Sequence, residues 1–248
     1  MTDTPGAVRP DRRAELAAGL ARVEARIADA CAVAGRDRAE VTLVAVTKTY
    51  PAGDVVALAG LGVTDVGENR DQEAAPKAAE AAAAGATPRW HFIGQLQRNK
   101  ARSVVRYADV VQSVDSVRLA AALDAAAAVA RDRPLDVLVQ VSIDGAPARG
   151  GALPGAADPD RGLDPVADAV VGSAALRLAG LMAVAPLGWE PERAFARLAE
   201  VAERFRARHP GATLLSAGMS GDLESAIGYG ATHVRVGSAL LGMRPTLR

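Results

Sequence analysis

The feature that most constrains this chain is a regular alternation of short apolar runs with helix-like segments. The apolar runs are expected to form β-strands that begin near residues 41, 63, 89, 109, 135, 176, 213 and 233. A helical segment follows each of them, and strands that alternate with helices imply a parallel sheet. Eight such units in 248 residues match a single (β/α)8 TIM barrel, with an open doubly wound sheet as the alternative.

One extra helix is expected ahead of the first strand. Between residues 11 and 34, apolar side chains recur at steps of three and four, the pattern of an amphipathic helix: Leu16, Leu20, Val23 and Ile27. Residues 1–10 are expected to be disordered and residues 11–248 to form one barrel domain, because no low-complexity linker marks a second. A Gly/Pro-rich stretch from 145 to about 164 is expected to be the one long irregular loop.

Composition narrows the function classes. Lysine plus arginine and aspartate plus glutamate both total 29, so the zero net charge offers no long-range attraction to nucleic acid or an anionic membrane. The single cysteine, Cys31, excludes internal disulfides and is expected to be a helix-packing thiol. The sequence has neither a signal-peptide core nor an apolar run long enough to span a bilayer, which predicts a cytoplasmic protein. We expect no metal, because no pair of histidines or carboxylates has ligand spacing, and no dinucleotide or ATP, because their glycine motifs are absent.

Residues 41–51 form the stretch that points most directly to chemistry. They predict a buried strand that ends in Lys48 and is closed by Pro51. An ammonium at the end of a buried strand either reaches water or is used chemically. The chain has three lysines against 26 arginines. Since an arginine stays protonated whereas a lysine amine can form a Schiff base, Lys48 is a candidate for covalent chemistry.

Two glycine-containing turns follow the last two predicted strands, Ser-Ala-Gly-Met-Ser-Gly at 216–221 and Val-Gly-Ser at 236–238. A strand, a Gly/Ser turn and a helix N-terminus together can bind a phosphate, and the loops after strands seven and eight are a frequent phosphate site in these barrels. The alternative is that each glycine only permits a tight turn. Because the two turns occur together, the phosphate site is favoured.

A Schiff-base lysine combined with a phosphate site suggests pyridoxal 5′-phosphate (PLP) as the ligand. Arg235 lies two residues before Gly237, on the same side of the last strand, and could reach the pyridine nitrogen. A guanidinium only donates hydrogen bonds, so the ring nitrogen would stay unprotonated. The alternative for Arg235 is a salt bridge inside the barrel. His91 is expected to be either a core histidine or a ligand-side residue, and His209 and His233 are given little functional weight.

The same residues resemble those of the YggS/PROSC family of pyridoxal-phosphate homeostasis proteins, whose fold is like the barrel domain of alanine racemase (fold type III of PLP proteins). The resemblance covers about residues 41–242. It rests on motifs that occur in this order: Leu-Val-Ala-Val-Thr-Lys at 43–48, Gly-Glu-Asn at 67–69, Trp-His-Phe-Ile-Gly at 90–94, Gly-Leu-Met at 180–182, Gly-Met-Ser at 218–220 and Val-Arg-Val-Gly at 234–237.

The resemblance implies a role for each matched residue. Lys48 would carry the cofactor as an internal aldimine, and Arg235 would face the pyridine nitrogen. Asn69 and Met182 would line the pocket. The phosphate would be held by the residues of the two glycine-containing turns, namely Ser216, Gly218, Met219, Gly237 and Ser238.

These assignments lead to a PLP carrier as the expected function, with no robust catalysis. Alanine racemase uses a second base from another domain, and Tyr50 is the one local tyrosine near Lys48. With one base and an unprotonated pyridine, no efficient racemisation is expected. The alternatives are a low-activity alanine or serine racemase and a cofactor-free Schiff-base aldolase. PLP-dependent apo-enzymes are the expected partners, and a monomer is expected.

Overall fold

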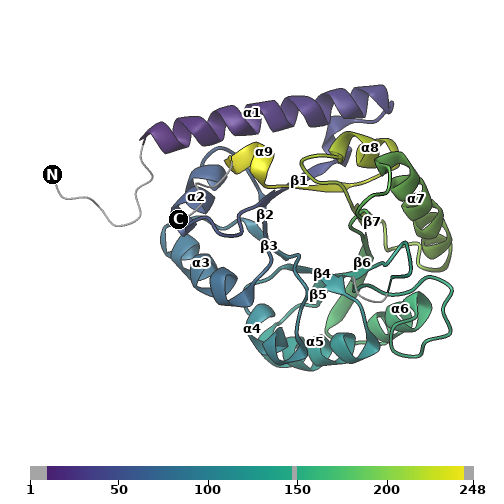
Figure 1. The fold of residues 1–248 in the computed structure, drawn as a ribbon. Helices are drawn as coiled ribbons and strands as arrows, with labels where there is room; N and C mark the ends of the chain where they lie inside the picture. The colour runs from purple at the N-terminus through teal and green to yellow at the C-terminus, as the bar shows by residue number, and fades with distance from the viewer. Residues whose placement is uncertain (1–9, 147–149, 243–248) are drawn as a thin grey trace.

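The computed structural model describes residues 10–146 and 150–242, and within them the eight predicted strands close into a parallel barrel in sequence order (Figure 1). The strands are β1 (Thr42–Val46), β2 (Asp65–Glu68), β3 (Arg89–Phe92), β4 (Val110–Val114), β5 (Leu135–Gln140), β6 (Leu176–Met182), β7 (Leu214–Ser216) and β8 (His233–Val236). Each begins within two residues of its predicted start. The pairing of β1 with β8, for example Ala45 opposite Val236, closes the sheet and rules out the open alternative.

Helices surround the barrel and connect the strands. They are α1 (Pro10–Val33), α2 (Ala52–Ala59), α3 (Asp71–Ala83), α4 (Ala101–Val104), α5 (Val117–Ala130), α6 (Leu163–Val171), α7 (Pro191–Arg208), α8 (Leu223–Gly228) and α9 (Ser238–Leu241), with short 3-10 turns at η1 (Arg38–Glu40) and η2 (Arg98–Lys100). No helix in the described ranges is long and apolar enough to cross a membrane. The sequence predicts disorder for residues 1–10. Residues 1–9 lie outside the described residues, and for Pro10 the prediction is wrong, because this residue begins α1.

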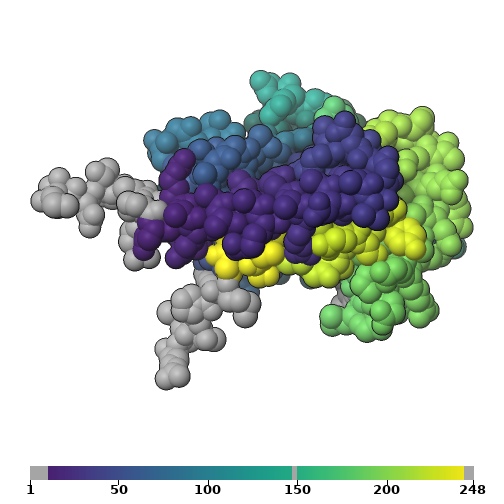
Figure 2. Space-filling model, turned by 90° about the horizontal axis from the view of Figure 1, so that it is seen from above, coloured from purple at the N-terminus to yellow at the C-terminus, as the bar shows by residue number. Residues whose placement is uncertain are grey.

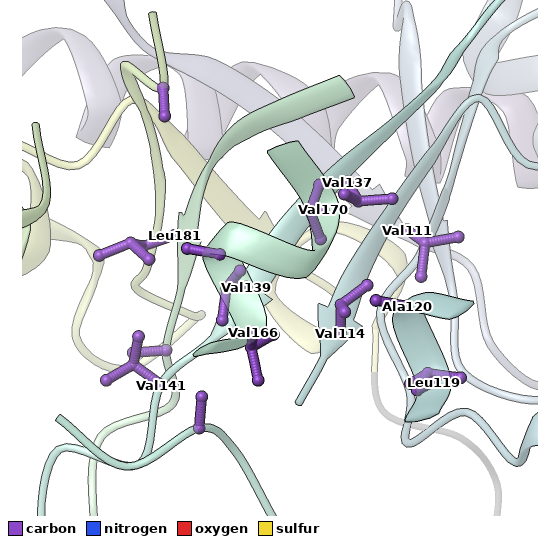
Figure 3. Packing of buried hydrophobic residues seen from close by; sticks show 14 of the residues in the cluster. Val111, Val114, Leu119, Ala120, Val137, Val139, Val141, Val166, Val170 and Leu181 are labelled. Atoms are coloured by element: carbon purple, nitrogen blue, oxygen red, sulfur yellow. The ribbon is translucent and has the colours of Figure 1, made fainter. Parts of the chain in front are cut away.

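The main core lies between the barrel wall and the helices. Val137 and Val139 of β5 and Val111 of β4 point outward and are buried against helices α5 and α6 (Figure 3). Because helices cover the outside and side chains fill the inside, these strands are apolar on both faces. The barrel interior is only partly apolar: a small cluster of Val110, Leu138, Ala179 and Met182 lies there beside buried polar side chains.

The predicted irregular loop contains some regular pairing. Val141 forms an isolated bridge with Ala152, and Leu153 forms one with Gly162. The carboxylate of Asp158 accepts the backbone N–H groups of Asp160 and Arg161 at 2.8 and 2.9 Å, which closes a tight turn. Residues 152–162 are therefore folded back onto the end of β5.

Helix α1 lies outside the eight repeating units and crosses the outer surface of α8 and α9 (Figures 1 and 2). Its apolar side is buried as predicted, including Leu16, Val23 and Ile27, and Cys31 is a buried free thiol. Gly19 allows the closest approach, because a Cβ there would lie 2.2 Å from the carbonyl oxygen of Leu240 in α9. Helix α1 is thus in backbone contact with the last helix of the barrel.

Gly19→Ala is expected to destabilise the protein by about 1–3 kcal/mol, because the added methyl group collides with the Leu240 carbonyl. Helix propensity alone predicts the opposite sign, a gain of roughly 1 kcal/mol. The measurement is urea unfolding, with Gly228→Ala as the control, since a Cβ at this other helical glycine meets nothing within 4 Å. Equal or greater stability of Gly19→Ala would contradict the close contact.

Candidate functional site

Lys48 lies at the mouth of the barrel, just beyond β1. The sequence predicts a strand that ends in this lysine, whereas the strand ends at Val46, because Tyr50 N–H turns back to the carbonyl of Thr47 at 3.0 Å. Thr49 in this turn has a φ of 73°, a left-handed conformation that non-glycine residues rarely adopt. The side chain of Lys48 is exposed, and no described residue forms an ion pair with it.

A second lysine, Lys77 of α3, fixes this turn from beneath. Its Nζ donates to the carbonyl of Thr47 at 2.8 Å and forms an ion pair with Glu68 Oε1 at 2.6 Å. Thr47 Oγ1 donates to the same carboxylate oxygen at 2.7 Å, and all three side chains are buried. A buried pair holds its geometry, because separating the charges would leave each unpaired. Sequence reasoning missed this pair, although Lys77 is a rare lysine on the buried side of α3.

Two buried acceptor atoms beside the Lys48 turn have no hydrogen-bond partner among the described residues: Glu68 Oε2 and Asn69 Oδ1. They lie at the end of β2, which pairs with β1 through Gly67 and Val46. Burial raises the pKa of Glu68, and the bonds from Lys77 and Thr47 oppose this shift. Because a buried acceptor without a donor is costly, Asn69 Oδ1 is suited to accept a hydrogen bond from a ligand.

The turns after β7 and β8 meet at the same mouth. Gly218 has a φ of 88°, and a Cβ there would lie 2.6 Å from the Cβ of Ala226, so only glycine fits this turn. Ser220 Oγ lies 3.4 Å from Ser238 Oγ and 3.4 Å from the backbone N of Ala239, which brings the two turns together.

The backbone N–H groups of Ser220, Gly221 and Ser238 have no acceptor among the described residues. By contrast, the N–H of Met219 donates to Asp222 Oδ1 at 2.6 Å, so this predicted phosphate donor is already engaged. Helices α8 and α9 contain only six and four residues, so their dipoles add less than the sequence suggests. An anion would be bound here mainly by the N–H groups of the turns.

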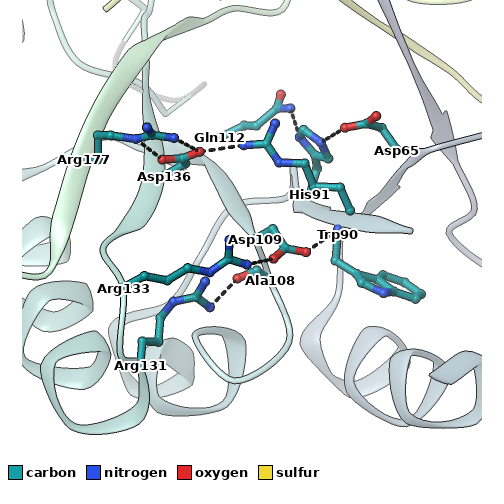
Figure 4. A network of polar contacts seen from close by, with 11 residues as sticks. Asp65, Trp90, His91, Ala108, Asp109, Gln112, Arg131, Arg133, Asp136 and Arg177 are labelled. Atoms are coloured by element: carbon teal, nitrogen blue, oxygen red, sulfur yellow. Dashed lines mark hydrogen bonds and ion pairs between the residues drawn. The ribbon is translucent and has the colours of Figure 1, made fainter. Parts of the chain in front are cut away.

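A chain of hydrogen bonds crosses the barrel interior in one direction. Arg235 donates to Ser216 Oγ at 2.7 Å, and Ser216 donates to Gln112 Oε1 at 2.7 Å. Gln112 continues to His91 Nδ1 at 2.8 Å, and His91 Nε2 lies 2.8 Å from Asp65 Oδ1 (Figure 4). Burial raises the pKa of Asp65, but the bonds from His91 and Thr64 outweigh it and leave this pKa below its usual value. His91 is therefore a satisfied core histidine, one of the two expected roles.

Arg235 is buried in the barrel, and no carboxylate of the described residues pairs with it. Its other terminal nitrogen donates to the carbonyl of Ala183 at 2.8 Å. Burial lowers its pKa to about 10, against the influence of Asp222, so it remains a cation at neutral pH. The alternative of a salt bridge inside the barrel is wrong, because no carboxylate among the described residues pairs with it. A buried cation without a counter-ion is costly, which suits this site to an anionic or acceptor ligand.

The remaining predicted site residues lie at the ends of strands around this mouth. Met182 ends β6 and is buried inside the barrel, and Ser216 ends β7. Gly237 follows β8 next to Val46 of β1, and a Cβ there would make only an ordinary contact with the Val46 carbonyl, at 3.4 Å. Tyr50 donates its hydroxyl to the carbonyl of Gly242 at 2.7 Å.

A cavity of about 840 Å³ lies across the mouth from β8, over the loops after β3, β4 and β5. It is lined by polar side chains that include Gln95, Arg98, Asp115 and the Arg118–Asp160 ion pair, whose N–O distance is 2.6 Å. It contains none of the residues predicted to bind the cofactor. Sequence reasoning missed it because it is formed by three separate loops.

Comparison with known proteins gives consistent matches. The family model for the alanine racemase N-terminal domain matches residues 20–245. A protein of Mycobacterium leprae named pyridoxal phosphate homeostasis protein is 46% identical over 247 residues, covering 94% of each chain. The Escherichia coli K12 protein of the same name is 37% identical over 238 residues, covering 93% of this chain and 97% of its own.

A solved structure shares both the fold and part of the sequence. PipY of Synechococcus elongatus PCC7942, solved with PLP bound, aligns with a TM-score of 0.71 and 33% identity. The alignment covers 87% of this chain and all of PipY. The likeness thus extends over nearly the whole barrel.

The buried His233 is expected to make stability fall in acid. Burial in the barrel lowers its pKa from 6.5 to about 4, so the folded protein keeps it neutral while the unfolded chain protonates it. This contribution is fully present above about pH 6.5 and is lost as the pH falls toward 4, by up to roughly 3 kcal/mol.

The measurement is urea unfolding between pH 7 and pH 4.5 for the wild type and His233→Gln. His233→Gln should show a shallower loss of unfolding free energy than the wild type. Identical pH dependence in the two proteins would show that His233 does not cause it.

Proposed function

The chain belongs to the family of pyridoxal phosphate homeostasis proteins, which share the barrel of the alanine racemase N-terminal domain, and we propose that it binds PLP at the barrel mouth. We further propose that it holds this cofactor for PLP-dependent apo-enzymes of the cytoplasm. The observation that carries the proposal is the buried guanidinium of Arg235. This cation has no carboxylate partner within residues 10–146 and 150–242, and it lies at the mouth that also holds Lys48. A ligand with an aromatic ring that accepts a hydrogen bond from this guanidinium, and with a phosphate, suits such a site.

Lys48 is proposed as the point of covalent attachment. Bound PLP supplies an aldehyde, which is the group that a lysine amine attacks. The backbone just before Lys48 is held by Lys77, which donates to the Thr47 carbonyl and pairs with Glu68. Because β1 pairs with β8, this turn lies next to Gly237 and Ser238, within reach of the same small ligand. Asn69 Oδ1, an acceptor without a donor, would bind a hydroxyl of the ligand.

The proposed phosphate site consists of the turns after β7 and β8. The N–H groups of Ser220, Gly221 and Ser238 have no acceptor among the described residues and lie in turns that meet through Ser220 Oγ. Gly218 permits the left-handed backbone conformation of the turn after β7. The fit supports a role for Gly218, Gly237 and Ser238, while Met219 would contribute only after exchanging its bond with Asp222.

Holding the cofactor, with little catalysis, is the proposed activity. A guanidinium only donates, so Arg235 would keep a pyridine nitrogen unprotonated and limit the ring as an electron sink. Tyr50, the tyrosine that follows Lys48 most closely in the sequence, donates its hydroxyl to the carbonyl of Gly242, which does not favour it as a second base. Racemisation of alanine or serine at rates typical of enzymes, roughly 1–10³ per second, would contradict this part of the proposal.

Lys48→Ala is expected to abolish the visible absorption of the PLP-loaded protein. Borohydride reduction of the wild type followed by peptide mapping should place the label on Lys48. Lys100→Ala is the matched control, because Lys100 lies on η2 with its ammonium 3.9 Å from Asp71 of α3, and this variant should leave absorption and label intact. A label on Lys77 or Lys100 would refute the assignment.

Arg235→Glu is expected to change the absorption spectrum of bound PLP, because a carboxylate can accept a proton shared with the pyridine nitrogen. Arg235→Gln removes the charge, and a glutamine side chain is not a base that could share a proton with the pyridine nitrogen. This variant should therefore weaken PLP binding by about tenfold or more without the same spectral change. Absorption titration with PLP measures both effects. Spectra and affinities equal to those of the wild type would remove Arg235 from the site.

A further inference from the structure

Helix α1 is not needed to complete the eight repeating units, yet it lies directly on the two units that form the proposed phosphate site. It crosses the outer side of α8 and α9, the helices that follow the turns after β7 and β8 (Figures 1 and 2). Gly19 brings it into backbone contact with Leu240 of α9. The helix is therefore placed to act on both turns from behind.

Arg26 of α1 reaches the turn after β7. Its Nε and a terminal nitrogen bind the two carboxylate oxygens of Glu224 in the first turn of α8, at 2.7 and 2.9 Å. Its other terminal nitrogen donates to the backbone carbonyl of Ser220 at 3.0 Å. The paired interaction lowers the pKa of Glu224 and raises that of Arg26, so both groups are charged. A planar guanidinium bound at three points has little freedom to turn.

The bond to the Ser220 carbonyl also fixes an N–H group. In a planar trans peptide the C=O and the following N–H point in opposite directions, and the described residues contain no cis peptide. Since the Ser220 carbonyl points to Arg26, the N–H of Gly221 points away from α1. The N–H of Gly221 has no acceptor among the described residues. The side-chain oxygen of Ser220, the other residue of this peptide, contacts Ser238 of the neighbouring turn.

We propose that Arg26 is a positioning residue for the cofactor's phosphate, holding the Ser220–Gly221 peptide so that the Gly221 N–H faces the phosphate. This inference rests on the proposed PLP function and adds to it a contact from outside the barrel. It also gives α1 a role: an extra helix that orients part of the binding site without touching the ligand.

Two other arginines in or next to α1 also bind backbone carbonyls, but not those of the phosphate turns. Arg12 donates to the carbonyl of Leu241 at 3.1 Å, and Arg36, just beyond α1, donates to the carbonyls of Ile227 and Ala231 at 2.9 and 2.8 Å. Leu241 and Ile227 lie at the far ends of α9 and α8, and Ala231 lies just beyond α8. Arg26 alone among the three reaches a residue of the phosphate turns, so its loss should affect the ligand's phosphate selectively.

The test compares PLP with pyridoxal, which has the same ring and aldehyde but no phosphate. In Arg26→Gln, the affinity for PLP should fall about tenfold, while the affinity for pyridoxal should change by less than about twofold. Arg22→Gln is the matched control, because Arg22 is exposed on the same helix and pairs with no described residue. It should leave both affinities unchanged. Since the Arg26–Glu224 pair is half-exposed, the melting temperatures of the two variants should be similar.

Equal weakening of PLP and pyridoxal in Arg26→Gln would assign the residue to general packing and overturn the inference, as would an unchanged PLP affinity. Glu224→Gln keeps the bond from Arg26 to Ser220 available and should give a PLP affinity between those of the wild type and Arg26→Gln. An affinity as low as that of Arg26→Gln would implicate the ion pair in place of the carbonyl bond and overturn the inference. Failure of the wild type itself to bind PLP would instead refute the proposed function.

Discussion

The pairing of β1 with β8 is the interaction on which the rest of this structure depends. It closes the sheet, so every strand finds two neighbours and no edge is left exposed. It also brings the turn that carries Lys48 beside the turn that carries Gly237 and Ser238, although these lie near opposite ends of the sequence. The amine of Lys48 and the free backbone N–H groups therefore lie at the same mouth of the barrel. A ligand of the size of PLP needs both groups this close together.

The barrel interior shows how a buried charge is kept without a direct ion pair. Arg235 donates to Ser216, and the chain of donors runs on through Gln112 and His91 to the carboxylate of Asp65. Aligned dipoles of this kind strengthen one another in a medium of low polarity. The negative charge therefore sits deep in the barrel, and the guanidinium keeps donors available at the mouth. A carboxylate beside Arg235 would have satisfied the cation and left less for a ligand.

The sequence predicted the repeating pattern of this fold well, because each strand is a local apolar run bounded by turn residues. It also located Lys48, Gly218 and Arg235 at strand ends, where barrel chemistry occurs. It could not show that Lys77 is buried against Glu68, because that contact joins α3 to β2 and depends on how the helix docks. For the same reason the sequence could not show that Asp222 accepts the N–H of Met219, or that Arg26 donates to the carbonyl of Ser220.

The sequence by itself therefore determined the number and order of the elements, the lysine suited to an aldehyde and the glycines suited to an anion, since these follow from residue type and spacing along the chain. Only the tertiary structure decided which N–H groups are free, which charge lacks a partner and which outside helix supports the turns. Those properties depend on distances and directions between residues far apart in sequence, and closure of the barrel fixes them.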